Sequence, residues 1–289
     1  EIKEVVGNWS IWIDGEFGEF TLGKTKPRSR ILDEKSFHIG IDKRLSDDGD
    51  LFGFALGLGE DTPVDRNHDS HMESRNYSLS TYGKFDDRSY ALQYIFGVSK
   101  LEFNSDRLDG EELLTGEREA NQVYGSLALI SSLSSESSNW QLSPYIRIDG
   151  SYTEFDEFSE IGGEAALTFD ELTLSNAKAS IGTDISYLFS GSKLNVMPYI
   201  TFEYGLDYSE TSSQNMYYTV EGPTRNYILD LDDGMKTHNW QVDIGLMLET
   251  FSAMNTTIGC RFQGRSSYFS DYSSISVSYT HLRAHETSL

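Results

Sequence analysis

Apolar and polar side chains alternate along much of the chain. In residues 194–208, Ile200 and Phe202 share one face, while Thr201 and Glu203 share the other. The same division recurs in the runs 89–98, 140–152 and 240–249. Because successive side chains of a strand point to opposite faces of a sheet, the pattern predicts long strands with one apolar face and one polar or small face.

The alternation extends over about twelve segments, an even number that is typical of bacterial membrane barrels. Strands are predicted at 9–22, 36–44, 51–59, 76–85, 89–103, 121–133, 139–154, 174–189, 194–208, 239–249, 255–265 and 269–279. Many of them reach the roughly 9 to 11 residues that cross a bilayer at a tilt. The sequence therefore predicts an all-β fold, a closed antiparallel transmembrane β-barrel of about 12 strands with long extracellular loops.

The predicted connections alternate in length. Short ones are predicted at 46–50, 86–87, 134–138, 190–192 and 251–255. Long ones are predicted between them, at 23–35, 60–75, 104–120, 155–172 and 209–238. Since membrane barrels have short periplasmic turns and long extracellular loops, this parity predicts an outer-membrane protein with both chain ends on the periplasmic side.

Several aromatic residues lie toward the ends of the predicted strands. They include Trp9, Trp140, Tyr152, Tyr208 and Trp240. Such rings suit the two interfacial girdles of a membrane barrel. The alternative is that they form the core of a soluble β-sandwich. We disfavour it, because a sandwich has little use for so many long strands with charged faces turned inward.

The average composition does not decide between these folds. The chain has 289 residues, a formal net charge of -23 and a mean hydropathy of -0.44, values that suggest a soluble acidic protein. A membrane barrel, however, needs apolar residues only at alternate positions of each strand, so its mean hydropathy stays low. No run approaches the roughly 18 apolar residues of a membrane helix.

Charge and cysteine content exclude other classes. The acidic balance argues against nucleic acid, whose phosphates require basic patches. Cys260 is the only cysteine, which excludes an internal disulfide and a zinc site built on several thiolates. No nucleotide-binding motif is visible, and no cofactor is predicted.

The two ends of the chain are predicted to lie outside the barrel domain. Residues 1–8 are predicted to be the end of a linker segment, and nothing at Glu1 resembles a signal peptide. Residues 9–276 are predicted to form the barrel domain. Residues 277–287 resemble the translation of a sequencing adaptor, so we interpret 277–289 as adaptor-derived, completing the last strand at most, and give its histidines no function.

Two of the strands open with a Pro-Tyr pair, Pro144-Tyr145 and Pro198-Tyr199. After the second of these strands, the runs 216–220 and 227–231 flank a turn-rich segment at 221–225, which predicts a hairpin. In these features, and over nearly the whole chain, the sequence resembles the autotransporter β-domain. In that family the connection at this place is a long extracellular loop that often forms a hairpin.

The resemblance implies a translocator barrel that enables export of an N-terminal passenger, and it implies no enzyme activity. The implied partners are outer-membrane lipid, the chain's own passenger and the barrel-assembly machinery. Two features depart from the family. The final aromatic residue that the assembly machinery recognises is replaced by the adaptor-like tail, and the helix that precedes the first strand is represented by residues 1–8 at most.

Charged residues on the polar faces of the strands are the candidate site. In a barrel they would line a hydrated lumen through which an unfolded passenger passes; equally, they would be a solvated or mutually paired interior. The candidates are Asp14, Glu16, Arg147, Asp149, Asp184, Glu203, Asp243, Glu249 and Arg261.

Two other groups of residues have side chains that are common in metal or catalytic sites. Asp65, His68 and His71 are close in sequence, but they lie in an irregular segment without a second partner segment, so an acidic loop is favoured and no metal is predicted. His38 and Asp42 share one face of their strand, yet no nucleophile accompanies them, so a lumen histidine is favoured over a catalytic one.

Two other functions remain open. The first is a stand-alone porin or adhesin barrel without a passenger, which the sequence upstream of Glu1 would distinguish from an autotransporter. The second is an outer-membrane hydrolase, which would be supported if substitution of His38 or His68 abolished an observed activity.

Overall fold

The computed structural model describes residues 9–22, 30–46, 49–63, 70–87, 89–133, 138–209, 212–230, 236–250, 255–265 and 271–280. Within these ranges, twelve long strands belong to one antiparallel sheet. They are β1 (Trp9–Leu22), β2 (Arg30–Arg44), β3 (Leu51–Pro63), β4 (Ser70–Asp87), β5 (Tyr90–Asp109), β6 (Glu112–Ser131), β7 (Trp140–Phe155), β10 (Leu172–Tyr187), β11 (Leu194–Ser209), β14 (Lys236–Thr250), β15 (Asn255–Arg265) and β16 (Asp271–Thr280).

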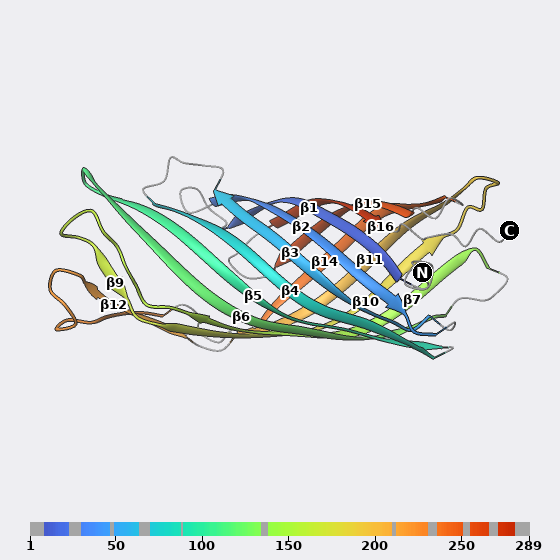
Figure 1. Ribbon diagram of the computed structural model, residues 1–289, viewed down its shortest axis with the longest axis horizontal. Helices are drawn as coiled ribbons and strands as arrows, with labels where there is room; N and C mark the ends of the chain where they lie inside the picture. Colours follow the sequence, from blue (N-terminus) through green and yellow to red (C-terminus); the bar gives the residue numbers. More distant parts are fainter. Residues whose placement is uncertain are drawn as a thin grey trace, which may run out of the picture.

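Each of these strands pairs with its neighbours in chain order, and the sheet curls as it proceeds (Figure 1). β1 pairs with β2 along one side and with β16 along the other, where Trp12 lies opposite Thr280. Every strand predicted from the alternation overlaps one of these twelve. The prediction of an all-β, antiparallel fold is therefore confirmed.

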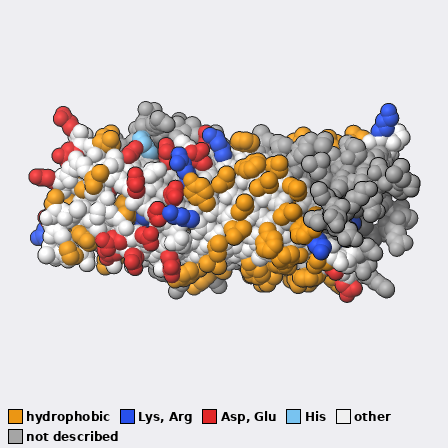
Figure 2. All heavy atoms as spheres, in the orientation of Figure 1, with side chains coloured by type: hydrophobic (Ala, Val, Ile, Leu, Met, Phe, Trp, Pro, Cys, Tyr) orange, Lys and Arg blue, Asp and Glu red, His pale blue; other side chains and the backbone are white. Residues whose placement is uncertain are grey.

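The two faces of the sheet differ as the alternation predicts. Large apolar side chains such as Leu56, Ile148 and Ile181 are 57%, 66% and 62% exposed, so they lie on the outer face. The residues between them, such as Ala55 and Ser80, are buried on the inner face. Figure 2 shows the hydrophobic side chains gathered over the body of the sheet, with Asp and Glu concentrated toward one end. Within the described part of the chain, no helix is long and apolar enough to span a membrane.

The predicted long loop at 104–120 is wrong. Here β5 and β6, each of 20 residues, stay paired from Tyr90 opposite Ser131 to Asp109 opposite Glu112. The turn contains Gly110, whose φ of 62° suits glycine. Polar residues occupy both faces of the hairpin tip, so the apolar alternation disappears while the backbone hydrogen bonds continue. The predicted loop at 60–75 is also too long, since β3 ends at Pro63 and β4 begins at Ser70.

A second sheet lies at the same end as the β5–β6 tip (Figure 1). It consists of β8 (Phe158–Ser159), β9 (Leu167–Phe169), β12 (Ser213–Tyr218) and β13 (Tyr227–Asp230), in the order β13-β12-β9-β8. β12 and β13 pair with Met216 opposite Tyr227, which confirms the predicted hairpin. We call residues 156–171 and 212–230 together the surface platform, and the end of the sheet that bears it the loop end.

Glycines on the inner face make room for aromatic rings from the next strand. A Cβ on Gly97 would lie 2.4 Å from Cζ of Tyr124 and 2.9 Å from the backbone oxygen of Leu79. The side chain of Tyr124 therefore lies across the position where a larger residue 97 would project. Gly53 with Tyr82 and Gly245 with Tyr199 repeat this contact.

Gly97→Ala is expected to destabilise the fold by about 1–3 kcal/mol, because the added methyl group overlaps both a ring and a backbone atom. Gly150→Ala is the matched control, since the nearest atom to its added Cβ, the oxygen of Asn176, is 3.8 Å away. Samples are incubated at a series of temperatures before electrophoresis. The temperature at which the folded form, recognised by its different gel mobility, disappears measures the effect. Equal temperatures for the two variants would contradict the prediction.

Candidate functional site

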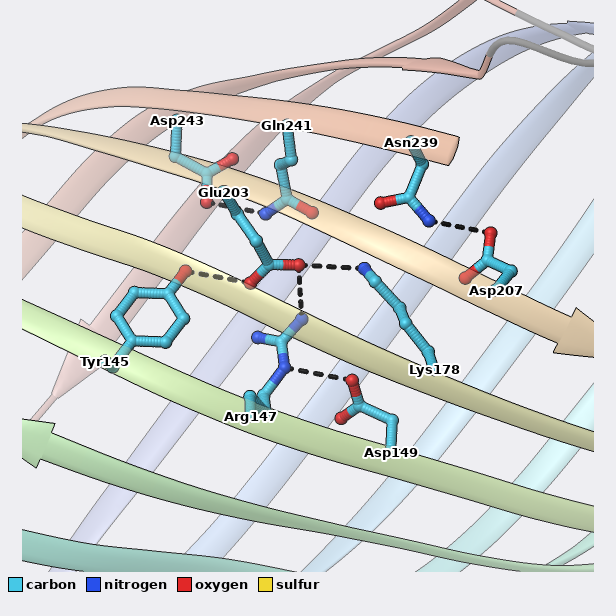
Figure 3. A network of polar contacts seen from close by, with 9 residues as sticks. All are labelled: Tyr145, Arg147, Asp149, Lys178, Glu203, Asp207, Asn239, Gln241 and Asp243. Atoms are coloured by element: carbon cyan, nitrogen blue, oxygen red, sulfur yellow. Dashed lines mark hydrogen bonds and ion pairs between the residues drawn. The ribbon is translucent and has the colours of Figure 1, made fainter. Parts of the chain in front are cut away.

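Glu203 is the centre of a charged cluster on the inner face (Figure 3). It lies on β11, and its side chain has 0% exposed surface. Its Oε1 accepts hydrogen bonds from Nη2 of Arg147 and from Nζ of Lys178, each at 2.8 Å. Its Oε2 accepts one from the hydroxyl of Tyr145 at 2.8 Å. A fully buried carboxylate is thus compensated by two cations and a hydroxyl, as its desolvation requires.

Two glycines allow these partners to reach Glu203. Gly182 lies between Tyr145 and Glu203 in the strand register, opposite both of them. A Cβ on Gly182 would lie 2.4 Å from Cζ of Tyr145, so the ring crosses β10 over this glycine. Similarly, a Cβ on Gly205 would lie 2.6 Å from Cε of Lys178. The absence of side chains at Gly182 and Gly205 therefore leaves space for two long side chains to reach one carboxylate.

Further carboxylates surround the cluster, each with a polar partner. Asp149 accepts a hydrogen bond from Nε of Arg147 at 3.0 Å, so this arginine joins two carboxylates. The other three bonds are Thr201 Oγ1 to Asp184 at 2.5 Å, Asn239 Nδ2 to Asp207 at 2.7 Å and Gln241 Nε2 to Asp243 at 2.9 Å. Five carboxylates therefore accompany two cations on β7, β10, β11 and β14, which gives this wall a negative electrostatic potential.

The opposite wall, on β1 to β6, is built differently. Asp14 lies 3.9 Å from Nδ1 of His38, and the hydroxyl of Tyr82 donates to Asp42 at 3.0 Å. Small residues such as Ala55 and Ser80 occupy much of the rest and leave a pocket of about 430 Å³ on this wall. On this wall the indole nitrogen of Trp12 also donates to Tyr82, so Trp12, Tyr82 and Asp42 form a chain that carries one charge, whereas the Glu203 network joins two cations and two carboxylates.

The structure brings together only some of the predicted site residues. Arg147, Asp149 and Glu203 share one network. Asp184 on β10 and Asp243 on β14 lie on the two strands that pair with β11, the strand of Glu203. Three predicted residues lie apart: Asp14 is near His38, Glu16 is half-buried on β1, and Glu249 is exposed at the far end of β14 with Asn195 as its donor. Arg261 is opposite Asp243 in the register of β14 and β15, and its side chain is outside the described residues.

The sequence reasoning missed Lys178 and Tyr145. Lys178 lies six residues before Asp184, and this even spacing places it on the same face, so the alternation alone could have identified it. The contact of Tyr145 with Glu203 depends on the strand register and could not be identified in that way.

The predicted acidic loop lies mostly outside the described residues. Asp65 and His68 lie outside the described residues, whereas His71 lies in β4. Among the described residues, no group of three or more His, Cys, Asp or Glu side chains is placed to hold a metal ion.

Comparison with known proteins identifies the family of the fold that carries these residues. The family model "Autotransporter beta-domain" matches residues 15–263, which is most of the chain. The chain belongs to the autotransporter β-domain family. A comparison with curated proteins found no match.

Solved structures of autotransporter β-domains share the fold at low sequence identity. The chain is similar to the translocator domain of the autotransporter NalP from Neisseria meningitidis, with 13% identity, 96% of this chain and 91% of that chain covered, and a TM-score of 0.72. It is also similar to the β-domain of the Bordetella autotransporter BrkA, with 9% identity, coverage of 95% and 99%, and a TM-score of 0.71. The transport unit of AIDA-I from Escherichia coli gives 13% identity, coverage of 94% and 90%, and a TM-score of 0.55.

Proposed function

We propose that this autotransporter β-domain is a closed barrel of twelve membrane-spanning strands in the outer membrane, and that it exports a passenger attached to its N-terminal side. The match to the autotransporter family over residues 15–263 is the observation that carries the proposal. The pairing of β1 with β16 supports closure. Closure is physically required in lipid, because unpaired strand edges would leave backbone groups without hydrogen-bond partners.

The exposed apolar side chains of the outer face support insertion in lipid. Residues such as Phe17, Leu56 and Ile148 would contact acyl chains, whereas in water they would form an unusually large apolar patch. We further propose that 9–276 is the barrel domain and that both of its ends are periplasmic. Outer-membrane lipid, the passenger and the barrel-assembly machinery are the proposed partners.

The inner-face charges suit a water-filled passage for unfolded polypeptide. In this proposal Arg147, Asp184 and Glu203 line the lumen, together with the other predicted residues. Because the charges of the Glu203 cluster are satisfied by one another, they bind a passing chain only weakly. An apolar inner face would instead retain the hydrophobic segments of an unfolded passenger. The paired polar wall therefore allows a chain of varied sequence to pass.

The test joins a signal peptide and a reporter passenger to the chain upstream of Glu1. One version keeps residues 277–289, and a second replaces them with a strand end that finishes on an aromatic residue. We expect outer-membrane fractions to contain a form whose gel mobility changes on boiling, and added protease to remove the passenger from intact cells. A shifted barrel with an internal passenger would favour a porin or adhesin, and a soluble, unshifted chain would overturn the barrel itself.

A further inference from the structure

The surface platform contacts the inner face of the β5–β6 tip. Inner-face residue Leu114 is 0% exposed there, whereas its outer-face neighbour Leu113 is 53% exposed. A Cβ on Gly163 of the platform would lie 3.2 Å from Cδ2 of Leu114. The platform therefore packs on the side of the tip that faces the barrel axis, and it lies beside any path that leaves the lumen at this end.

Arg118 of β6 joins three parts of the platform. Its guanidinium donates to the backbone oxygen of Asp156 at 2.8 Å, to that of Asp170 at 2.9 Å and to Oε1 of Gln214 at 3.0 Å. Gln214 is 3% exposed, and its amide nitrogen donates to the same Asp170 oxygen at 2.8 Å. One side chain thus fixes both ends of the first platform segment and the start of β12.

Aromatic rings and the planar shape of the guanidinium hold Arg118 in this position. Its Cζ lies 5.1 Å from the ring centroid of Phe155 and 5.3 Å from that of Phe158. Phe158 in turn stacks on Phe169 of β9 at 4.7 Å. Lysine cannot replace these contacts, because its ammonium group is a point donor without the planar fork that serves several acceptors at once.

Arg107 of β5 makes a second attachment. Its Nε and Nη2 donate to the two carboxylate oxygens of Glu160 at 3.1 and 2.6 Å, and Nη2 also donates to the backbone oxygen of Ala165 at 2.9 Å. Glu160 is 6% exposed and also accepts from the backbone nitrogen of Leu167 at 3.0 Å. This bidentate ion pair, in which the carboxylate is buried and the guanidinium is half-buried, connects the tip to the start of β9.

We propose that Arg107 and Arg118 are positioning residues for export, which hold the platform against the β5–β6 tip and clear of the lumen exit. The inference rests on the proposed function. We call these two arginines and their acceptors the lock. Without the lock, the backbone hydrogen bonds of Thr115 with Ile161 and of Asp156 with Glu119 do not suffice to hold the platform, which moves across the exit and slows emergence of the passenger. The lock acts at the loop end, and the Glu203 cluster does not contact it.

The test compares Arg118→Ala and Arg107→Ala with Arg225→Ala, which removes an exposed arginine from the turn between β12 and β13 of the same platform. We expect hydrogen exchange in residues 213–218 to accelerate by about tenfold or more in the two lock variants, because buried acceptors lose their donors. Passenger exposure to external protease should be delayed, and bilayer recordings should show more frequent closures. The boiled and unboiled gel forms should stay distinct in all variants.

Cross-linking the platform tests whether position alone matters. Thr115 of β6 and Ile161 of the platform face each other in an antiparallel bridge, so Thr115→Cys with Ile161→Cys joins the platform to the tip by a disulfide. In an Arg118→Ala background, this bond should restore the timing of export under oxidising conditions and lose that effect on reduction.

Three results would overturn the inference. Unchanged exchange in residues 213–218 would show that the arginines do not hold the platform. Faster exchange with unchanged export would show that its position does not matter. Faster export would show that the held platform is itself a barrier. If the unsubstituted chain exports no passenger, the proposed function fails. Hydrogen exchange and conductance still show whether the two arginines hold the platform against the tip.

Discussion

Glu203→Ala is expected to lower the free energy of unfolding by about 2–4 kcal/mol, because it removes the shared carboxylate of a buried charge cluster. Arg147 retains Asp149, but Lys178 and Tyr145 lose the partner that the structure gives them at 2.8 Å. Both side chains already cross a glycine to reach Glu203, so they are committed to this direction.

Glu249→Ala is the matched control for this substitution. Glu249 is exposed at the other end of the neighbouring strand and accepts a bond from Asn195 at 3.2 Å, so its loss should cost less than about 0.5 kcal/mol. Urea unfolding of both variants in lipid vesicles, followed by tryptophan fluorescence, gives the comparison. A Glu203 variant as stable as the Glu249 variant would show that the cluster contributes nothing net to the fold.

Glu203→Gln separates the charge from the hydrogen bonds. The amide keeps one acceptor oxygen, which can serve either Tyr145 or the two cations, and it removes the negative charge. We expect an intermediate loss of stability. If glutamine behaved as alanine does, the charge itself would be the important feature of residue 203.

The strands could be predicted because one face of each must be apolar while the other need not be. In β11, Phe202 and Glu203 differ in exposure as this rule requires, being 45% and 4% exposed. The alternation therefore located the strands and the face of each charged residue. It could not give the register, and the register decides which charges meet.

At the hairpin tip, the apolar alternation no longer predicts the strands. Beyond about residue 103 the strands carry polar groups such as Asn104, Asp106 and Glu117, so no apolar face marks them. The backbone hydrogen bonds are indifferent to side-chain polarity, and pairing continues to Asp109 opposite Glu112. A sequence pattern that reports burial cannot distinguish such a hairpin from a loop.

The platform could not be predicted for a different reason. Its lock joins Arg118 to Asp156, Asp170 and Gln214, positions up to 96 residues apart in the sequence. Each of these residues is common in surface loops, and only the folded arrangement shows that one guanidinium serves them all. The β12–β13 hairpin was predictable because its two strand-like runs flank a turn, whereas its attachment to β6 was not.

The lumen is expected to be cation-selective if the proposed barrel conducts ions. Among the described inner-face residues of the body of the sheet, cations such as Lys84, Arg147 and Lys178 are outnumbered by carboxylates. Besides Glu203 and Asp86, these carboxylates include Asp14, Asp42, Asp149, Asp184, Asp207 and Asp243. A narrow, low-dielectric wall strengthens the field of such an excess and raises the local concentration of cations.

Reversal potentials across planar bilayers in asymmetric KCl measure this selectivity. The unsubstituted chain should favour K⁺ severalfold, and Asp184→Asn with Asp243→Asn should move the reversal potential toward zero while the amide oxygens preserve the bonds from Thr201 and Gln241. Glu102→Gln is the control, since Glu102 pairs with Lys100 on the outer face. Selectivity should also weaken near 1 M salt, where the screening length falls to about 3 Å. An anion-selective pore, or an equal shift in the Glu102 variant, would mean that the inner-face carboxylates do not face the conducting path, and the lumen assignment of Asp184 and Asp243 would then be wrong.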